Sequence, residues 1–135
     1  MKNILRLLLL TPFLALAQEL PDEDWVCITT HHQDSILFSE DNTLENLKLD
    51  ALPTYVFNPS KGYRFVEDSD YLSRDCAIRN TVRGPDIYVC SGTSVLGGET
   101  VFALNKREGK FNYTFTQLDV HRQSVGILMG DCNKI

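Results

Sequence analysis

Short runs of β-forming residues separated by turn signals recur along this chain, most clearly within residues 88–132. Residues 111–116 alternate apolar and polar side chains, as a strand with one buried face does. Gly97-Gly98 separates two such runs, which predicts a tight hairpin turn. A tight turn of this kind joins antiparallel strands and cannot join parallel ones. The pattern therefore predicts a mainly β fold, either an antiparallel β-sandwich or a small β-barrel.

Residues 125–130 are apolar throughout, interrupted only by glycines. A strand that is apolar on both sides is expected where both faces of a sheet are covered, so this run is predicted to lie centrally in the sheet. Its glycines predict the close approach of a neighbouring strand, or a bend.

The one candidate helix covers residues 42–52. Leu44, Leu47 and Ala51 share one face of a helix, and Pro53 would end it. Leu47 would suit a strand equally well. We therefore expect at most one short helix in this segment, or a surface loop.

Residues 1–17 have the form of a secretory signal peptide. Lys2 and Arg6 supply a positive start, and an apolar run at residues 7–16 ends in small residues at the expected cleavage point. The run is about half of the ~20 residues that a membrane-spanning helix needs. We therefore expect a single soluble domain from Gln18 onwards, without a membrane span, that is exported to a periplasm or secreted.

The acidic charge of the chain limits its partners. The formal net charge of −5 becomes −7 when Lys2 and Arg6 leave with the leader. A surface of this sign repels phosphate backbones and anionic lipid headgroups. Nucleic acid and membrane surfaces are therefore not expected as partners.

Four cysteines follow the leader, and an even number in an exported chain predicts two disulfides. They are separated too widely for the common zinc motifs, which use closely spaced pairs. We therefore expect a disulfide-stapled β domain without cofactors. The cysteines are Cys27, Cys76, Cys90 and Cys132.

An internal similarity suggests two related halves, residues 25–76 and 88–132. Each half contains an Asn and a Gly four residues apart between two strand-like runs, at residues 58–62 and 105–109. Each half also ends in a cysteine. The aromatic residues that follow the two glycines differ in position by one, which places them on opposite faces of a strand. A duplication and a chance resemblance both remain open.

The similarity favours one of the three ways to pair the cysteines. If the halves are duplicates, each is closed by its own disulfide, and the preferred pairs are Cys27 with Cys76 and Cys90 with Cys132. A second pairing, Cys76 with Cys90, stays open because it would staple a hairpin across residues 83–86.

Candidate metal ligands are few. His31, His32 and Asp34 lie close together in the sequence. Adjacent residues on a strand point to opposite faces, so the two histidines would share an ion only from a loop. We therefore expect no metal and no catalytic set, with these residues as the weak metal candidates.

Exposed tyrosines would indicate a binding surface, because tyrosine combines a large apolar ring with a polar tip. The candidates are Tyr55, Tyr63, Tyr71 and Tyr113. The alternative, which we favour, is that most of them fill the core, since a domain of this size has few other large side chains.

The features together predict an exported, non-catalytic β domain that binds a protein or a cell-envelope component. One alternative is a carrier that holds a small apolar ligand inside the β domain. Another is a small hydrolase or metal-dependent enzyme, which would need histidines and carboxylates from distant segments to converge. Its residues would be His31, His32 or His121 with Asp34, Asp119 or Asp131.

Overall fold

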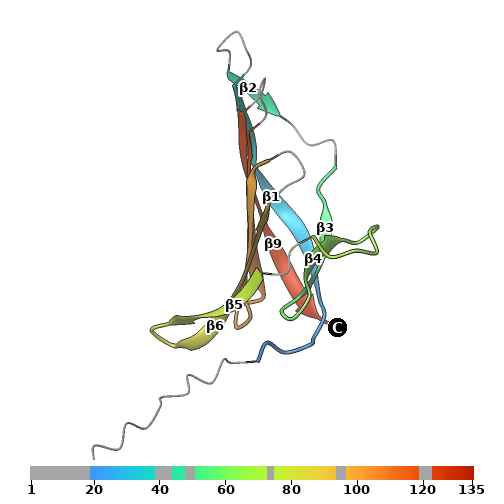
Figure 1. Ribbon diagram of the computed structural model, residues 1–135, viewed down its shortest axis with the longest axis vertical. Coiled ribbons are helices and arrows are strands. Elements are labelled where there is room, and N and C mark those ends of the chain that lie inside the picture. The colour runs from blue at the N-terminus through green and yellow to red at the C-terminus, as the bar shows by residue number, and fades with distance from the viewer. Residues whose placement is uncertain (1–18, 39–43, 48–50, 73–74, 94–96, 119–122) are drawn as a thin grey trace, which may run out of the picture.

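The computed structural model of the protein describes residues 19–38, 44–47, 51–72, 75–93, 97–118 and 123–135. Nine strands lie within these residues and form one sheet in which neighbouring strands are antiparallel (Figure 1). In chain order the strands are β1 (Trp25–Phe38), β2 (Leu44–Leu47), β3 (Thr54–Asn58), β4 (Gly62–Phe65), β5 (Asp75–Thr81), β6 (Gly84–Thr93), β7 (Glu99–Asn105), β8 (Lys110–Leu118) and β9 (Gln123–Lys134).

The order of strands across the sheet is β4-β3-β1-β9-β8-β7-β6-β5, and β2 pairs with the last part of β1. β5 to β9 form a meander, because each of these strands pairs with the next one along the chain. β9 then pairs with β1 over most of its length, so the first and last strands lie side by side in the middle of the sheet. The mainly β, antiparallel fold predicted from the sequence is confirmed.

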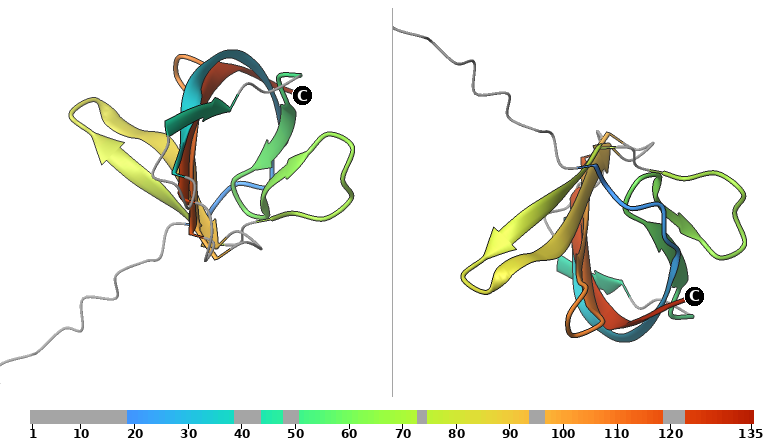
Figure 2. Two further views of the ribbon diagram at one scale, coloured as in Figure 1. Left: turned by 90° about the horizontal axis from the view of Figure 1, so that it is seen from above. Right: turned by 90° about the horizontal axis from the view of Figure 1, so that it is seen from below.

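The sheet curls until β3 and β4 face β7 and β8, which gives a nearly closed barrel (Figure 2). Tyr63 on β4 donates a hydrogen bond from its hydroxyl to Oγ1 of Thr100 on β7 over 2.7 Å. Tyr55 on β3 packs edge-on against Phe102 on β7, with ring centroids 5.6 Å apart. The β5–β6 hairpin projects away from the barrel (Figures 1 and 2), although Tyr88 on β6 still packs against Phe57 on β3, with ring centroids 6.1 Å apart.

Phe102 lies at the centre of an aromatic core. Its ring stacks on Phe57 and on Phe111, with centroid separations of 5.0 and 5.1 Å and interplanar angles of 11° and 4°. Its other ring contacts are with Tyr55, Tyr63 and Tyr113. Aromatic contacts add ~0.5–1.5 kcal/mol each beyond the burial of apolar area. The part of the interior that the structure describes is thus filled by rings.

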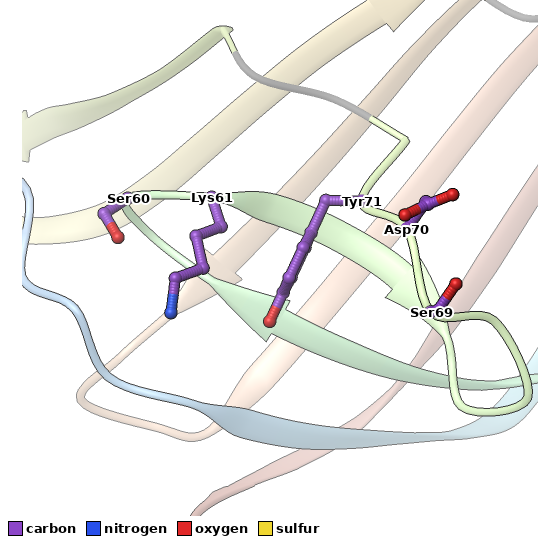
Figure 3. Close-up of a pocket in the computed structure, with 5 residues that line it drawn as sticks. All are labelled: Ser60, Lys61, Ser69, Asp70 and Tyr71. Atoms are coloured by element: carbon purple, nitrogen blue, oxygen red, sulfur yellow. The ribbon is translucent and has the colours of Figure 1, made fainter.

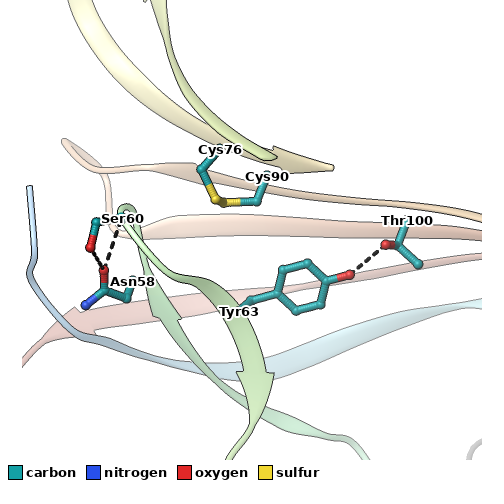
Figure 4. Close-up of a disulfide and its surroundings, with 6 residues drawn as sticks. All are labelled: Asn58, Ser60, Tyr63, Cys76, Cys90 and Thr100. Atoms are coloured by element: carbon teal, nitrogen blue, oxygen red, sulfur yellow. Dashed lines mark hydrogen bonds between the residues drawn. A yellow bond between two sulfur atoms is a disulfide. The ribbon is translucent and has the colours of Figure 1, made fainter. Parts of the chain in front are cut away.

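Each disulfide joins two residues that face each other on neighbouring strands. Cys27 pairs with Cys132 between β1 and β9, and Cys76 pairs with Cys90 between β5 and β6 (Figure 4). The preferred pairs, Cys27 with Cys76 and Cys90 with Cys132, are wrong, whereas the second pairing, Cys76 with Cys90, is correct. The physical reason is the pairing of β1 with β9, which brings the two ends of the domain together.

The two turns that suggest a repeat are alike in the structure. Asn58 and Asn105 each end a strand, and Oδ1 of each accepts a hydrogen bond from the backbone N–H two residues later. Both disulfides, however, join unit 25–76 to unit 88–132, so neither closes a unit. Duplication of the whole units stays a prediction.

The helix predicted for residues 42–52 is absent from the part of this segment that the structure describes, so that prediction is wrong there. Leu44–Leu47 form β2, and the described residues contain no helix. A short apolar period is a weak signal, and pairing with the long strand β1 outweighs it. The hairpin predicted at Gly97-Gly98 is present between β6 and β7, but Thr93 pairs with Glu99, so the loop is longer than predicted.

An N-terminal strap, residues 19–24, runs along one end of the barrel (Figure 1). Asn58 is fully buried, and its Nδ2 donates to Oδ1 of Asp22 and to Oδ1 of Asp24, each over 2.7 Å. Its Oδ1 accepts from the backbone N–H and the hydroxyl of Ser60 (Figure 4). The amide thus uses both of its N–H donors and both lone pairs of its oxygen, which makes its burial favourable.

Glu23 fixes the strap to two further strands. Its carboxylate accepts from the indole N–H of Trp25 over 3.1 Å and from the hydroxyl of Tyr88 over 3.4 Å, and it pairs with the ammonium group of Lys134. The hydrogen bond from Lys134 holds the pKa of the Glu23 carboxyl below its usual value, against the smaller effect of burial. The strap therefore ties β3, β6 and β9 together at the same end of the barrel.

Candidate functional site

The central strand β9 carries apolar side chains on both faces. Leu128 is buried in the core, so the alternation of a strand turns Val125, Ile127 and Met129 to the outside. Val125 is 50% exposed and Met129 is 38% exposed. The predicted central position of residues 125–130 is confirmed, but the described chain covers only the inner face of the strand.

The pairing register aligns the outward residues of β6 to β9 in two rows. From β9 to β6, the first row is Met129, Asn112, Ala103 and Val89. From β9 to β7, the second row is Ile127, Thr114 and Val101. We call these residues, together with Val125, the outer-face surface.

The outer-face surface has no formal charge, although the protein as a whole is acidic. Its apolar members form two groups, one on β9 and one on β6 and β7, and Asn112 and Thr114 of β8 lie between them. Exposed apolar surface marks interaction sites on soluble proteins, and methionine is enriched where such sites bind proteins. The arrangement therefore suits a largely apolar partner surface.

A shallow groove of about 520 Å³ lies beside Met129 at one end of the outer-face surface. Phe111 and Gly130 contribute apolar lining, and the ammonium group of Lys110 pairs with the carboxylate of Asp131 beside them. A Cβ at Gly130 would lie 2.0 Å from the carbonyl oxygen of Ile28, so this glycine permits the close strand approach predicted from the sequence.

The candidate metal ligands do not gather. His31 is exposed with its Nδ1 2.8 Å from Oγ1 of Thr30, whereas Nε2 of His32 is buried without a hydrogen-bond partner. The side chain of Asp34 and residues 119–122, which include Asp119 and His121, lie outside the described part. Among the described residues, no three His, Cys, Asp or Glu side chains are placed to hold a metal ion.

Most of the candidate surface tyrosines belong to the core. Tyr55 and Tyr63 are each 1% exposed and Tyr113 is 8% exposed, so they do not form a binding surface. Burial raises the pKa of the Tyr55 and Tyr113 hydroxyls well above their ordinary value. The alternative that most of them fill the core is correct.

Tyr71 differs, because it is only half-buried and lies in a second groove beside Lys61 and Asp70 (Figure 3). The Arg64 guanidinium lies 5.7 Å from the centre of its ring. Figure 3 shows the Lys61 and Tyr71 side chains pointing the same way, and both reach the strap. Lys61 pairs with Asp22 over 2.8 Å, and the hydroxyl of Tyr71 donates to Oδ1 of Asp24 over 3.4 Å. These contacts are explained by holding the strap, so Tyr71 alone is a weak candidate for binding.

The outer-face surface is the part of the site that sequence reasoning misses. Its signal is present in the sequence, because residues 87–90, 101–104 and 125–130 are apolar at odd and even positions alike. For residues 125–130 this pattern predicts burial on both faces, and the other two runs carry the same signal in a shorter form. Strands in which apolar and polar residues alternate would instead have indicated an outer face exposed to water.

No protein-family model matches this chain, and no curated protein or solved structure is significantly similar to it. Within the described residues, no helix is long and apolar enough to cross a membrane. Function is therefore argued from the surface itself.

Proposed function

We propose that this protein is an exported, non-catalytic domain that binds another protein through the outer-face surface. One observation carries the proposal: the outer-face surface brings together apolar side chains from β6, β7 and β9, and the described chain leaves Val125 and Met129 open to solvent. Burial of such side chains on association stabilises a complex by about 25 cal/mol per Å² of apolar area, before the cost of association.

A protein suits this surface better than the other partners considered. The surface is exposed and spans four strands, which matches the broad contact areas of protein complexes rather than the enclosed pockets of small ligands. Rings fill the described interior, where an apolar ligand carrier would need space. The net charge of −5 disfavours anionic envelope lipids.

Export is supported by two features. Two disulfides are typical of proteins that fold in an oxidising compartment. Residues 1–17 have the form of a signal peptide. Both features fit a periplasmic or secreted protein.

The proposal is tested with a photo-crosslinking residue placed at Met129 and, as a matched control, at Val66. Both side chains are exposed, at 38% and 47%, but Val66 lies outside the outer-face surface. We expect a defined protein adduct from the Met129 position in the native compartment, and no such adduct from Val66.

The captured partner is then purified and its affinity is measured for Met129→Lys and Val66→Lys. Placing a charge in an apolar interface should raise the dissociation constant at least about tenfold for Met129→Lys. Val66→Lys should leave it within about twofold. Equal adducts from both positions, or unchanged binding by Met129→Lys, would contradict the proposed function.

A further inference from the structure

β5 ends the sheet and pairs only with β6 among the described strands. Its outer edge therefore presents backbone N–H and C=O groups that can pair with another strand. The β5–β6 hairpin projects away from the barrel, which leaves room beside this edge (Figure 2). Exposed edges of this kind recruit further strands in many complexes.

The outward residues of β5 have a self-complementary pattern. Asp75, Ala77 and Arg79 share the outer face of the strand, and all three are exposed. The two charges are opposite in sign and lie equally far from Ala77, which is small. Neither Asp75 nor Arg79 forms an ion pair with another described residue.

The pairing with β6 determines which backbone groups face the free edge. Cys76 lies opposite Cys90 with a Cα–Cα distance of 4.0 Å, which marks the narrow, non-hydrogen-bonded type of antiparallel pair. These pairs alternate along a ladder, so the N–H and C=O groups of Cys76 and Ile78 point away from β6. At the free edge, Cys76 and Ile78 can therefore bond a new strand.

We propose that a second copy of this chain pairs with β5 in antiparallel fashion, about a two-fold axis at Ala77. The backbones of Cys76 and Ile78 then bond those of Ile78 and Cys76 in the second copy. Asp75 lies opposite Arg79 of the second copy, and Arg79 lies opposite its Asp75. Both charge pairs fall at non-hydrogen-bonded positions, where side chains across two strands are closest.

The register is specific, which favours a second copy over an unrelated strand. A two-fold interface contacts itself, so a residue on one side must complement its own partner on the other. Only an axis at Ala77 places Asp75 opposite Arg79 in both directions. An axis at any other position on β5 separates the two charges and loses both pairs.

Sedimentation velocity of the oxidised protein over a range of concentrations tests the association. We expect a monomer–dimer equilibrium for the native protein. Asp75→Arg and Arg79→Asp each place like charges opposite one another, and each should raise the dimer dissociation constant at least about tenfold. The double variant Asp75→Arg with Arg79→Asp restores both pairs and should recover association to within about threefold.

Two further measurements identify the surface. In the variant Arg79→Lys, a carbodiimide should link the Asp75 carboxylate of one copy to the amine introduced at position 79 of the other, and mixed isotope labelling should show that the link is intermolecular. Within one strand these positions are ~13 Å apart, too far for a direct amide. Met129→Lys is the matched control and should leave the dimer unchanged, because Met129 lies on the outer-face surface.

Three results would overturn the proposal: a monomer at all concentrations, a double variant no better than the single ones, or an Arg79→Lys dimer that lacks the link between Asp75 and position 79. Binding of an extended segment of another protein to β5 of the monomer would also contradict the proposal, because the edge would then have a different occupant. None of these results bears on binding through the outer-face surface, since the two surfaces are tested by separate variants.

Discussion

Nδ2 of Asn58 lies 2.7 Å from Oδ1 of Asp24, and the amide that makes this bond is fully buried. The bond fastens the N-terminal strap to the turn between β3 and β4. Because the same amide also bonds Asp22 and Ser60, its loss removes four hydrogen bonds at once.

Asn58→Ala should therefore destabilise the fold by about 2–4 kcal/mol, since buried polar groups lose their hydrogen bonds. The matched control is Asn105→Ala, at the similar turn between β7 and β8, where among the described residues Oδ1 accepts from the backbone of Arg107 and Glu108. We expect the control to cost about 1 kcal/mol. Chemical denaturation measures both values, and equal losses would show that the bonds to the strap contribute little.

The strap also predicts a loss of stability in acid. The hydrogen bond from Lys134 lowers the pKa of Glu23 below 4.5, and that from Lys61 lowers the pKa of Asp22 below 3.8. A lowered folded-state pKa stabilises the fold above the unfolded value, and this stabilisation disappears as the pH falls through the folded value. The free energy of unfolding should therefore decrease between about pH 5 and pH 3.

Glu23→Gln tests the origin of this acid sensitivity. The variant should be less stable than the native protein at neutral pH and should show a flatter decrease in acid, because one titrating group is gone. Denaturation curves at several pH values measure the slope. A slope identical to that of the native protein would assign the effect to other carboxylates.

A separate loss of stability is expected in alkali. Burial is the main cause of the raised pKa values of Tyr55 and Tyr113, whose ordinary value is 10.0. A raised folded-state pKa stabilises the fold below the unfolded value, and this stabilisation is lost as the pH rises above it. Each tyrosine should reduce the free energy of unfolding by up to about 1.4 kcal/mol per pH unit above pH ~10.

As the pH rises, the tyrosinate absorbance of Tyr55 and Tyr113 should appear at the same pH at which the protein unfolds. The reason is that their buried hydroxyls ionise only when the chain opens. Tyr55→Phe should reduce the alkaline slope by about half of their joint contribution. Ionisation of Tyr55 and Tyr113 in a protein that still has its native circular dichroism would contradict the assignment.

The two disulfides should differ in their contributions to stability. Cys27 and Cys132 are separated by 105 residues, and Cys76 and Cys90 by 14. In the chain-entropy account, a longer closed loop restricts the unfolded chain more, and the values are about 4.7 and 3 kcal/mol. Replacing Cys27 and Cys132 by Ala should therefore cost about 1.5–2 kcal/mol more than replacing Cys76 and Cys90. Guanidinium denaturation of the two double variants measures the difference, and the reverse order would contradict it.

Local features of the fold could be predicted from the sequence, whereas long-range ones could not. The alternation in residues 111–116 and the hairpin predicted across residues 83–86 depend on neighbours in the chain, and both correspond to elements of the meander, although the turn itself lies at residues 82–83 and β6 begins at Gly84. The neighbour of Cys27 depends instead on the pairing of β1 with β9, which no local pattern specifies. The internal similarity therefore led to the wrong disulfides although its turns are alike.

The candidate site shows the same division. The apolar character of residues 125–130 was visible in the sequence, and so was their central position in the sheet. The sequence could not show whether a second layer of this chain covers the outer face. The sequence could not show which tyrosines are buried and which are exposed either, because burial of Tyr55 and partial exposure of Tyr71 follow from the curl of the sheet.

The bond between Cys27 and Cys132 has a mechanical consequence. Tension applied at residue 19, where the strap begins, and at Ile135 would pass through this cross-link, because only residues 19–26 and 133–135 separate these two points from it. β2 to β8 lie wholly within the covalent ring and would carry no load. An oxidised molecule held at residue 19 and at Ile135 should thus extend under pulling by only these two short segments, and a partner tethered there would be anchored through an almost inextensible link.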